Sequence, residues 1–382
     1  MQDCKIGKDR PSEREEYPPT DRQPPQQDYP QEPTMPTIQH DVLNDLCYRI
    51  FAATGIPDAD AHTVADHVVE SHLNGHDSHG TWLVANYARA MKKNYVPWEE
   101  TEVERDTPAL RIVNGKGANG IVACNRAIDI AVEKAKKSTF GFVGLNSVSH
   151  ICRLGDYPPR IAEQGMIGMV WLNGGGLFLS PFGSADRRLR PEPIAFSAPR
   201  RDGPPFVLDM TMTVVAGGKI VQKNIREEPL PEGWVIDQNG QPVTDAGRYM
   251  DDPEGTGVLP LGGTQFGHKG YGLAMMVEML VGPLSHAGCT KDGGKGGNGV
   301  MVLAINIEDF IGLADYEREV EEMAQWVCSA RPLPDVKKIY APGEIEQEIK
   351  ARLLVDGIDL PQPTWDDIGE VATELGVEVP QI

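Results

Sequence analysis

The chain has 382 residues, and its formal net charge is −20 at pH 7. Hydrophobic residues make up 40% and charged residues 24% of it, the composition of a globular protein long enough for two domains. The negative charge argues against nucleic acid or an anionic membrane surface as the main partner, because both would repel the average surface. An anionic substrate needs only local positive charge and is not excluded.

The amino-terminal segment differs from the rest. Residues 1–36 hold 8 of the 31 prolines and a single branched aliphatic residue, Ile6. Such a segment cannot bury enough apolar area to offset the entropy of ordering it, so we expect a disordered tail. Its start is polar, rather than basic and then apolar, which argues against a secretory signal.

Two further features bear on location. The longest apolar-rich run, residues 271–281, is too short to span a bilayer and contains a glutamate. The six cysteines lie far apart and form no C-x-x-C pair, the pattern of free thiols rather than of a disulfide framework. We therefore expect a cytoplasmic protein, with neither nucleic acid nor a membrane as partner.

Helical spacing of apolar residues begins near Thr37. It predicts a helix over residues 42–51, a second from residues 58–60 to Gly75, and a third over residues 81–94. The stretch "GHDSHG", residues 75–80, therefore lies at a helix junction. A change of direction there can aim side chains into a cleft.

Beyond residue 108 strand and helix patterns alternate. Strands are predicted over residues 109–113, 142–145, 167–171, 194–198, 206–208 and 300–305, and helices over residues 119–137, 275–284, 316–328 and 345–355. The glycine-rich stretch "KDGGKGGNG", residues 291–299, predicts a flexible surface loop. The chain thus reads as mixed α/β, with helices at both ends and strands in the middle.

The stretch "GKGANG", residues 115–120, is a literal G-x-G-x-x-G between a predicted strand and a predicted helix. In a Rossmann unit such glycines let the backbone approach a pyrophosphate at a helix N-terminus. That unit also needs an acidic residue at the end of the next strand, which ends here in "FVGLNS" without a carboxylate. We therefore favour a plain turn over a cofactor loop.

Five of the nine histidines fall within residues 62–79. His72, His76 and His79 have the i, i+4, i+7 spacing of one helix face, which raises the hypothesis of a metal site. Against it, Gly75 is expected to end the helix between them, no cysteine is near, and no H-E-x-x-H is present. We predict no metal site and expect most of these histidines to be surface or core residues.

Ser78 and His79 are adjacent, and adjacent residues rarely form the hydrogen bond between a nucleophile and its base. A G-x-S-x-G elbow is also missing. A histidine that exchanges a proton with a carbonyl or alcohol oxygen needs less: a pKa of roughly 6.5 and reach to one oxygen. His150 follows a predicted strand, where α/β folds place ligand contacts, and its position suits a functional and a structural role equally.

Two later motifs could approach a ligand. In "FVLDMTMTVVAGGKI", Asp209 follows a strand and small residues lead to Lys219; free N–H groups at such a turn suit a phosphate, whereas a plain N-cap is the alternative for Asp209. In "FGHKGYG", Lys269 stands between glycines, which lets an ammonium approach a ligand closely. A solvated turn lysine is the common alternative.

Taken together, these stretches resemble the malate/L-lactate dehydrogenase family typified by sulfolactate, ureidoglycolate and diketogulonate dehydrogenases or reductases and by cyclic imino-acid reductases. The resemblance covers residues 38–380 and is distinct from Rossmann-type lactate and malate dehydrogenases. The matching stretches are "GHDSHGTWLVANY", "AEQGMIGMVWLN", "SPFGSADRRL", "PIAFSAP", "FVLDMTMTVVAGGKI", "PEGWVIDQNGQPVTD", "VLPLGG", "GHKGYGLAMMVEML" and "YAPGE".

The resemblance implies an NAD- or NADP-dependent oxidoreductase, usually a homodimer. It implies a mixed-sheet, non-Rossmann cofactor domain, residues 146–310, inserted in a helical or mixed domain built from residues 37–145 and 311–382. The proton-exchanging histidine maps to His79 in some members and to His150 in others, and Ser78 maps to a substrate-facing position. The implied cofactor contacts are Asn173, Gly174, Asp209, Met210, Thr211, Lys269, Gly270, Pro342, Gly343 and Glu344. The glycine-rich turn at residues 115–120 is not the family's principal cofactor loop.

Two departures from the family pattern concern the substrate. Leu83 stands where members commonly have an arginine that pairs with a substrate carboxylate, and a neutral side chain cannot form those charge-assisted bonds. The family's G-T-N-P is "RPEP" here, residues 190–193, which changes the backbone and polarity of that loop. Arg190 or Arg187 is a candidate replacement for the lost positive charge.

Three functions follow from these observations. The first is hydride transfer between nicotinamide and a small 2-oxo or 2-hydroxy acid, with His79 or His150 exchanging the proton. The second, within the same family, is reduction of a cyclic imine carboxylate, where the proton goes to nitrogen. The third is cofactor binding without catalysis, which the two departures favour and the presence of both histidines opposes.

Overall fold

The structure is a computed structural model that describes residues 35–292 and 297–381. The predicted tail, residues 1–36, lies outside the described residues except for its last two, and so does the middle of the predicted glycine-rich loop, residues 293–296. The mixed α/β class is confirmed, since helices alternate with a mixed sheet. The boundaries of the two domains, residues 146–310 against residues 37–145 with 311–382, stay a prediction.

A seven-stranded sheet forms the centre, in the order β2-β3-β4-β10-β5-β6-β7. Its strands are β2 (Glu102–Asp106), β3 (Leu110–Asn114), β4 (Phe140–Val148), β5 (Met166–Asn173), β6 (Ile194–Ala198), β7 (Phe206–Met210) and β10 (Asn298–Asn306). Only β3 and β4 pair in parallel; every other neighbouring pair is antiparallel. Strands β3, β4, β5 and β7 therefore run in one direction and end at the same end of the sheet.

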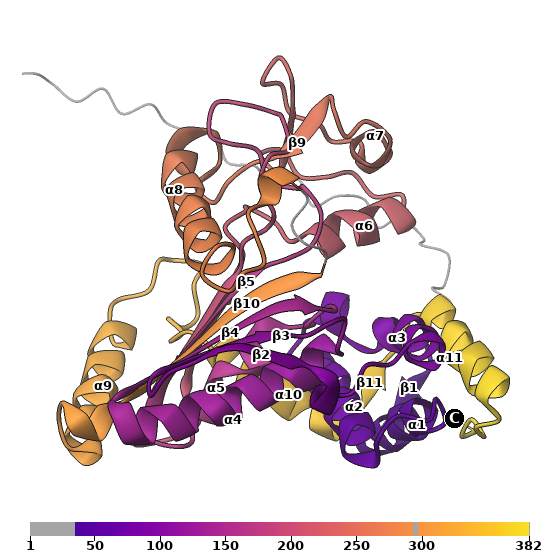
Figure 1. The fold of residues 1–382 in the computed structure, drawn as a ribbon. Coiled ribbons are helices and arrows are strands. Elements are labelled where there is room, and N and C mark those ends of the chain that lie inside the picture. The colour runs from indigo at the N-terminus through magenta and orange to yellow at the C-terminus, as the bar shows by residue number, and fades with distance from the viewer. Residues whose placement is uncertain (1–34, 293–296, 382) are drawn as a thin grey trace, which may run out of the picture. The chain divides into compact units, whose positions relative to one another are not determined.

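Helices cover both faces of this sheet (Figure 1). On one face lie α4 (Gly120–Ser138) and α5 (Pro158–Ala162), and on the other lies α8 (Gly263–Val281). Strand β10 shows why both faces are covered: Val300 and Val302 are buried toward α4, while Met301 and Leu303 are buried toward α8. A strand buried on both sides has no polar face, and the run "GVMVLAI" has none.

A helical layer packs beside the sheet. It comprises α1 (His40–Ala52), α2 (Asp58–Leu73), α3 (Val84–Lys93), α10 (Glu344–Asp356) and α11 (Gln362–Leu375). The short strands β1 (Thr37–Ile38) and β11 (Ile358–Asp359) pair antiparallel and join the start of this layer to the segment between α10 and α11. Its core holds Leu46, Phe51 and Val68 with Val371 of α11, which confirms the expected helices at both chain ends.

The remaining elements are α6 (Gly217–Ile225), α7 (Ala246–Asp251), β8 (Val235–Asp237), β9 (Thr256–Val258) and α9 (Leu313–Cys328). Strands β8 and β9 pair antiparallel, and they share a small core with α6 and α7. Within the described ranges, no helix combines the length and the apolar character needed to cross a membrane.

One predicted boundary is wrong by more than two turns. The helix expected over residues 275–284 already begins at Gly263 and ends at Val281. The glycines that suggest a loop are needed inside the helix: a Cβ atom on Gly270 would lie 2.5 Å from the carbonyl oxygen of Leu261. Lys269 is therefore a helical residue and not the turn residue that its flanking glycines suggest.

Candidate active site

The segment "GHDSHG" forms a tight corner after α2. Gly75 has a φ of +77°, which favours glycine, and a short 3₁₀ turn over Asp77–His79 follows. The Asp77 carboxylate accepts a hydrogen bond of 2.8 Å from the Ser78 N–H and fixes the start of this turn. A second turn, Thr81–Leu83, leads into α3, so the third predicted helix is α-helical only from Val84. The corner leaves the side chains of Ser78 and His79 half-buried.

His150 meets this corner from the sheet. It lies two residues beyond the end of β4, and its ring faces that of His79 with centroids 5.8 Å apart and planes inclined by 24°. The Ser78 hydroxyl lies 3.1 Å from Nδ1 of His79. The three predicted catalytic residues therefore lie together, although the chain forms two helices and three strands between the two histidines.

The glycine motif at residues 115–120 packs closely against the segment that carries His150. The backbone N–H of Gly117 donates to the Ser147 carbonyl at 2.7 Å, and a Cβ atom on Gly120 would lie 2.3 Å from the Ser149 carbonyl oxygen. The motif thus lets the start of α4 close against the segment that carries His150. This supports the interpretation of "GKGANG" as a turn.

The surroundings of the two imidazoles differ. Burial, together with the positive charge that His150 and other cations would place nearby, lowers the pKa of His79 to about 3. Burial also lowers the pKa of His150, but its side chain keeps an exposed face, so water offsets part of that cost. His79 is therefore neutral across the physiological range, and the pair does not hold two charges at once.

His72, His76 and His79 do not lie on one helix, although their spacing would allow it. Helix α2 ends at Leu73, and the Nδ1 atom of His72 contacts the Thr81 hydroxyl at 3.1 Å. His76 instead lies 3.8 Å from Glu346 at the start of α10. Among the residues that the structure describes, no three histidine, cysteine or acidic side chains are grouped to hold a metal ion.

Asp209 belongs to a buried ionic network rather than to a helix cap. Its Oδ2 atom accepts a hydrogen bond of 2.8 Å from the Gly155 N–H and lies 3.6 Å from Nε of Arg153. Arg153 also binds Asp156 at 2.5 Å. Burial raises the pKa of Asp209, and the neighbouring guanidinium opposes that rise. Sequence reasoning missed Arg153, and its only local signal is Asp156 three residues later.

Asn173 ends β5 at the same end of the sheet as His150. Its Oδ1 atom accepts a hydrogen bond of 2.6 Å from Arg190, and its Nδ2 atom donates one of 2.5 Å to Glu278. Both ends of the side-chain amide are thus occupied by the protein, and the Asn173 carbonyl also accepts a hydrogen bond of 3.3 Å from Arg190. Gly174 is closed in as well, since a Cβ atom there would lie 2.3 Å from Asn298.

Neither suggested arginine replaces a substrate-binding charge. Arg190 is 6% exposed and is engaged with Asn173. Arg187 donates to Thr256 and to the Tyr249 carbonyl, and its guanidinium lies 3.9 Å from the centre of the Tyr249 ring. The exchange of G-T-N-P for "RPEP" therefore builds an internal charge cluster.

Leu83 also points away from the site. It is 8% exposed and packs in the helical core. An exposed lysine follows a residue that touches Ser78: Lys219 comes directly after Gly218 in α6, and a Cβ atom on Gly218 would lie 2.9 Å from that of Ser78.

The other cofactor residues implied by the resemblance fall on three segments. Met210 ends β7, and the hydroxyl of Thr211 lies 2.7 Å from that of Thr213. The Pro342 carbonyl accepts a hydrogen bond of 3.3 Å from Val207 in β7, which brings residues 342–344 beside that strand. Glu344 pairs with Lys338 at 3.4 Å, and Gly343 has a φ of +96°. Lys269 is exposed on α8, with Gly270 buried behind it.

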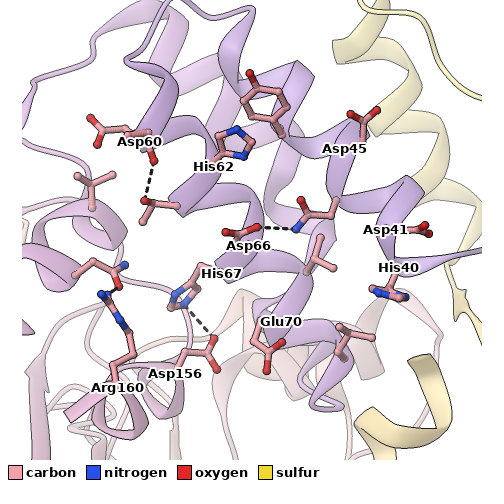
Figure 2. A pocket seen from close by; sticks show the side chains of 18 of the residues that line it. His40, Asp41, Asp45, Asp60, His62, Asp66, His67, Glu70, Asp156 and Arg160 are labelled. Atoms are coloured by element: carbon pink, nitrogen blue, oxygen red, sulfur yellow. Dashed lines mark hydrogen bonds and ion pairs between the residues drawn. The ribbon is translucent and has the colours of Figure 1, made fainter. Parts of the chain in front are cut away.

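A separate groove of about 1070 Å³ opens between α1, α2 and α4 (Figure 2). It does not include Ser78, His79 or His150 among its lining residues. His67 and Asp156 point toward one another in its wall, with Nε2 3.4 Å from Oδ2. Acidic side chains outnumber basic ones around it, and Asp156 joins it to the network of Arg153 and Asp209.

Residues 38–369 match the profile of the family described as malate/L-lactate dehydrogenase. The chain belongs to this family. It is 32% identical to a malate dehydrogenase of Pyrococcus abyssi over 89% of this chain and 95% of that protein. It is 31% identical to an L-sulfolactate dehydrogenase of Methanocaldococcus jannaschii, over 87% and 96% of the two chains. As a member of this family the chain is an oxidoreductase that acts on CH–OH groups.

Solved structures agree with this assignment. The malate dehydrogenase of Pyrococcus horikoshii superposes with a TM-score of 0.80 at 30% identity, covering 91% of this chain and 97% of that one. The delta1-piperideine-2-carboxylate reductase of Pseudomonas syringae superposes with a TM-score of 0.73 at 23% identity, over 88% and 100% of the chains. The second likeness concerns the fold alone.

Proposed function

We propose that this chain transfers hydride between a nicotinamide dinucleotide and a small 2-oxo or 2-hydroxy acid. The observation that carries the proposal is the contact of two histidine rings from separate segments, with the Ser78 hydroxyl beside them. Histidine suits proton exchange with an oxygen at neutral pH, and a hydroxyl can orient that oxygen. The groups needed besides the hydride carrier are therefore in one place.

The residues at the end of the sheet fit such a cofactor. A Cβ atom on Gly176 would meet no atom within 4 Å, so the chain beyond β5 leaves open space beside the site. Lys269 offers an exposed ammonium without an ion pair among the described side chains, which suits a phosphate. When bound, the nicotinamide supplies or accepts the hydride. Gly174, Asp209–Thr211, Lys269–Gly270 and residues 342–344 are the proposed contacts, and the buried Asn173 is proposed to support Gly174.

The chain's own residues would then handle the proton and the substrate. In reduction, one of the two histidines gives a proton to the oxygen of the former carbonyl, and in oxidation it takes that proton back. Ser78 donates a hydrogen bond to the same oxygen. The exposed ammonium of Lys219 is the candidate partner for a substrate carboxylate, since Leu83 lies in the core.

A second candidate is reduction of a cyclic imine carboxylate. The fold that the chain shares with delta1-piperideine-2-carboxylate reductase is consistent with it. The imine carbon accepts hydride as a carbonyl carbon does, and the proton goes to nitrogen. Turnover of imino acids in preference to 2-oxo acids would decide for it.

We further propose a cytoplasmic homodimer. Helix α9 buries only Glu321 and Ala324, and it leaves Met323 and Trp326 51% and 77% exposed, which is an uncovered apolar surface. Sedimentation of the purified chain tests the dimer. A species of monomer mass at micromolar concentration would contradict it.

The test of the proposed activity follows nicotinamide absorbance with NADH and NADPH separately. The substrates are a panel of 2-oxo acids, 2-oxo amides and cyclic imino acids. We expect turnover with one cofactor and a fall of at least about 100-fold in His79→Ala or His150→Ala, with cofactor binding intact. Cofactor binding without any turnover would favour the third function, a family member that has lost catalysis.

A further inference from the structure

Tyr87, the last residue of the stretch "GHDSHGTWLVANY", touches one of the two histidines. The hydroxyl of Tyr87, on α3, lies 2.5 Å from Nδ1 of His150. The Nε2 atom of His150 makes no hydrogen bond among the described residues, and the side chain keeps an exposed face. One ring nitrogen is thus held by the protein, and the other is open to a ligand.

The tyrosine hydroxyl has a second partner, the thiol of Cys152. The Cys152 thiol interacts with the Tyr87 hydroxyl, and its sulfur donates to the His79 carbonyl at 3.0 Å. A single orientation satisfies all these groups: Nδ1–H of His150 donates to Tyr87, the Tyr87 hydroxyl donates to Cys152, and the thiol donates to His79. Each donor is used once.

We propose that Tyr87 positions His150 for proton exchange, by accepting a hydrogen bond from Nδ1 so that Nε2 is the atom that meets the substrate. This inference rests on the proposed function and deepens it. With Nδ1 protonated, neutral His150 has its lone pair on Nε2 and can take the substrate's hydroxyl proton. The imidazolium then formed keeps the bond to Tyr87 and can return that proton in reduction.

The alternative orientation shows why the tyrosine matters. If the Tyr87 hydroxyl donated to Nδ1, the neutral ring would carry its proton on Nε2 and could not act as a base there. Burial raises the pKa of Tyr87 well above its ordinary value, which keeps the phenol protonated. The phenol is then a neutral acceptor whose own proton is directed to Cys152.

The test compares Tyr87→Phe with Tyr95→Phe in the full-length chain. Tyr95 is a matched control, because its hydroxyl also makes a 2.5 Å hydrogen bond, to Asp60, and both rings pack on the same helical core. Nitrogen NMR of ¹⁵N-histidine protein reports the tautomer of His150, whose signals are identified by their loss in His150→Gln. Turnover and cofactor affinity are measured on the same samples.

We expect neutral His150 of the wild type and of Tyr95→Phe to carry its proton on Nδ1. In Tyr87→Phe we expect a shift toward Nε2–H and a fall in kcat of about 10-fold or more, part of the roughly 10²–10⁴ that acid–base catalysis supplies. Cofactor affinity should stay within about twofold. A wild-type His150 protonated on Nε2, or an equal kcat loss in Tyr95→Phe, would overturn the inference. The NMR result stands even if no substrate is found, so failure of the proposed activity is told apart from failure of this inference.

Discussion

Gly218 at the start of α6 lies directly against Ser78: a Cβ atom on the glycine would be 2.9 Å from the Cβ atom of the serine. Two carbons do not approach so closely, so a methyl group there must push Ser78 or α6 aside. Since misplacement by about 1 Å can cost up to 10²-fold in rate, we expect Gly218→Ala to lower kcat/KM roughly 10-fold. Steady-state kinetics measures this.

The control for that substitution is Gly272→Ala in α8. It makes the same chemical change in a helix, and nothing lies within 4 Å of its Cβ position. We expect unchanged kinetics and slightly higher stability from the better helix former. Equal kinetics in both variants would mean that the contact between Gly218 and Ser78 does not position the serine.

The histidine corner should make the protein sensitive to acid. Burial and nearby positive charge lower the pKa of His79 from an ordinary value near 6.5 to about 3. Between these values the unfolded chain binds the proton and the folded chain does not, so stability is lost as pH falls from about 6.5 toward 3. We expect the Tm to decrease less in His79→Gln than in the wild type when the pH is lowered from 7.5 to 5. An identical loss would contradict the assignment of this sensitivity to His79.

Glu192 should give a dependence of opposite sign. It is fully buried, and burial together with the charge of Glu278 raises its pKa from 4.5 to about 9. The folded chain therefore holds a proton that the unfolded chain has released, and stability is lost as pH rises from about 4.5 through 9. We expect the Tm of Glu192→Gln to exceed that of the wild type by about 2–4 °C or more at pH 8.5. At pH 5 we expect a smaller difference in Tm. The exposed Glu163→Gln controls for the change of charge. A wild type and a Glu192→Gln variant that respond alike to pH would disprove this.

Arg190 should be a structural residue whose loss is costly. Its guanidinium is buried, donates to Asn173 and lowers the pKa of Glu192 by its charge. Arg190→Met would leave the Asn173 oxygen and the neighbouring carboxyls without that partner, at a cost of about 3 kcal/mol in the free energy of unfolding. Denaturant titration measures it. The matched control is Arg188→Met, whose exposed pair with Asp186 should contribute little. Similar losses in both variants would contradict the buried role.

Strong periodicity made most of the fold predictable. Strand β6 (Ile194–Ala198) has the predicted limits, and α4 and β10 differ by one or two residues at each end, because each has a continuous apolar pattern of a single period. Strand β2 has no such pattern and is exposed along its length, so no apolar periodicity predicts it. The start of α8 was missed because its glycines permit close packing, a property that depends on Leu261 and not on the local sequence.

Some residues of the candidate site can be identified from the sequence and others cannot. His79, His150 and Asp209 were identifiable because each stands in a distinctive local motif. The roles of Arg153 and Tyr87 were not, although Tyr87 ends the motif that holds His79, because each role depends on a partner from another segment: Asp209 for Arg153 and His150 for Tyr87. The apolar packing of Leu83 likewise depends on the whole helical core. Local patterns locate motifs, and only the folded chain shows which of them meet.

The most direct test of the proposed activity uses a nicotinamide cofactor deuterated on the ring carbon that carries the hydride. The wild type is incubated with the best substrate of the panel, and the product is analysed by mass spectrometry beside His150→Ala. We predict one deuterium on the carbon that bore the carbonyl or imine group, and loss of labelled product in the variant while cofactor binding persists. Product without label, or labelled product formed as fast by His150→Ala as by the wild type, would contradict a hydride transfer served by this histidine.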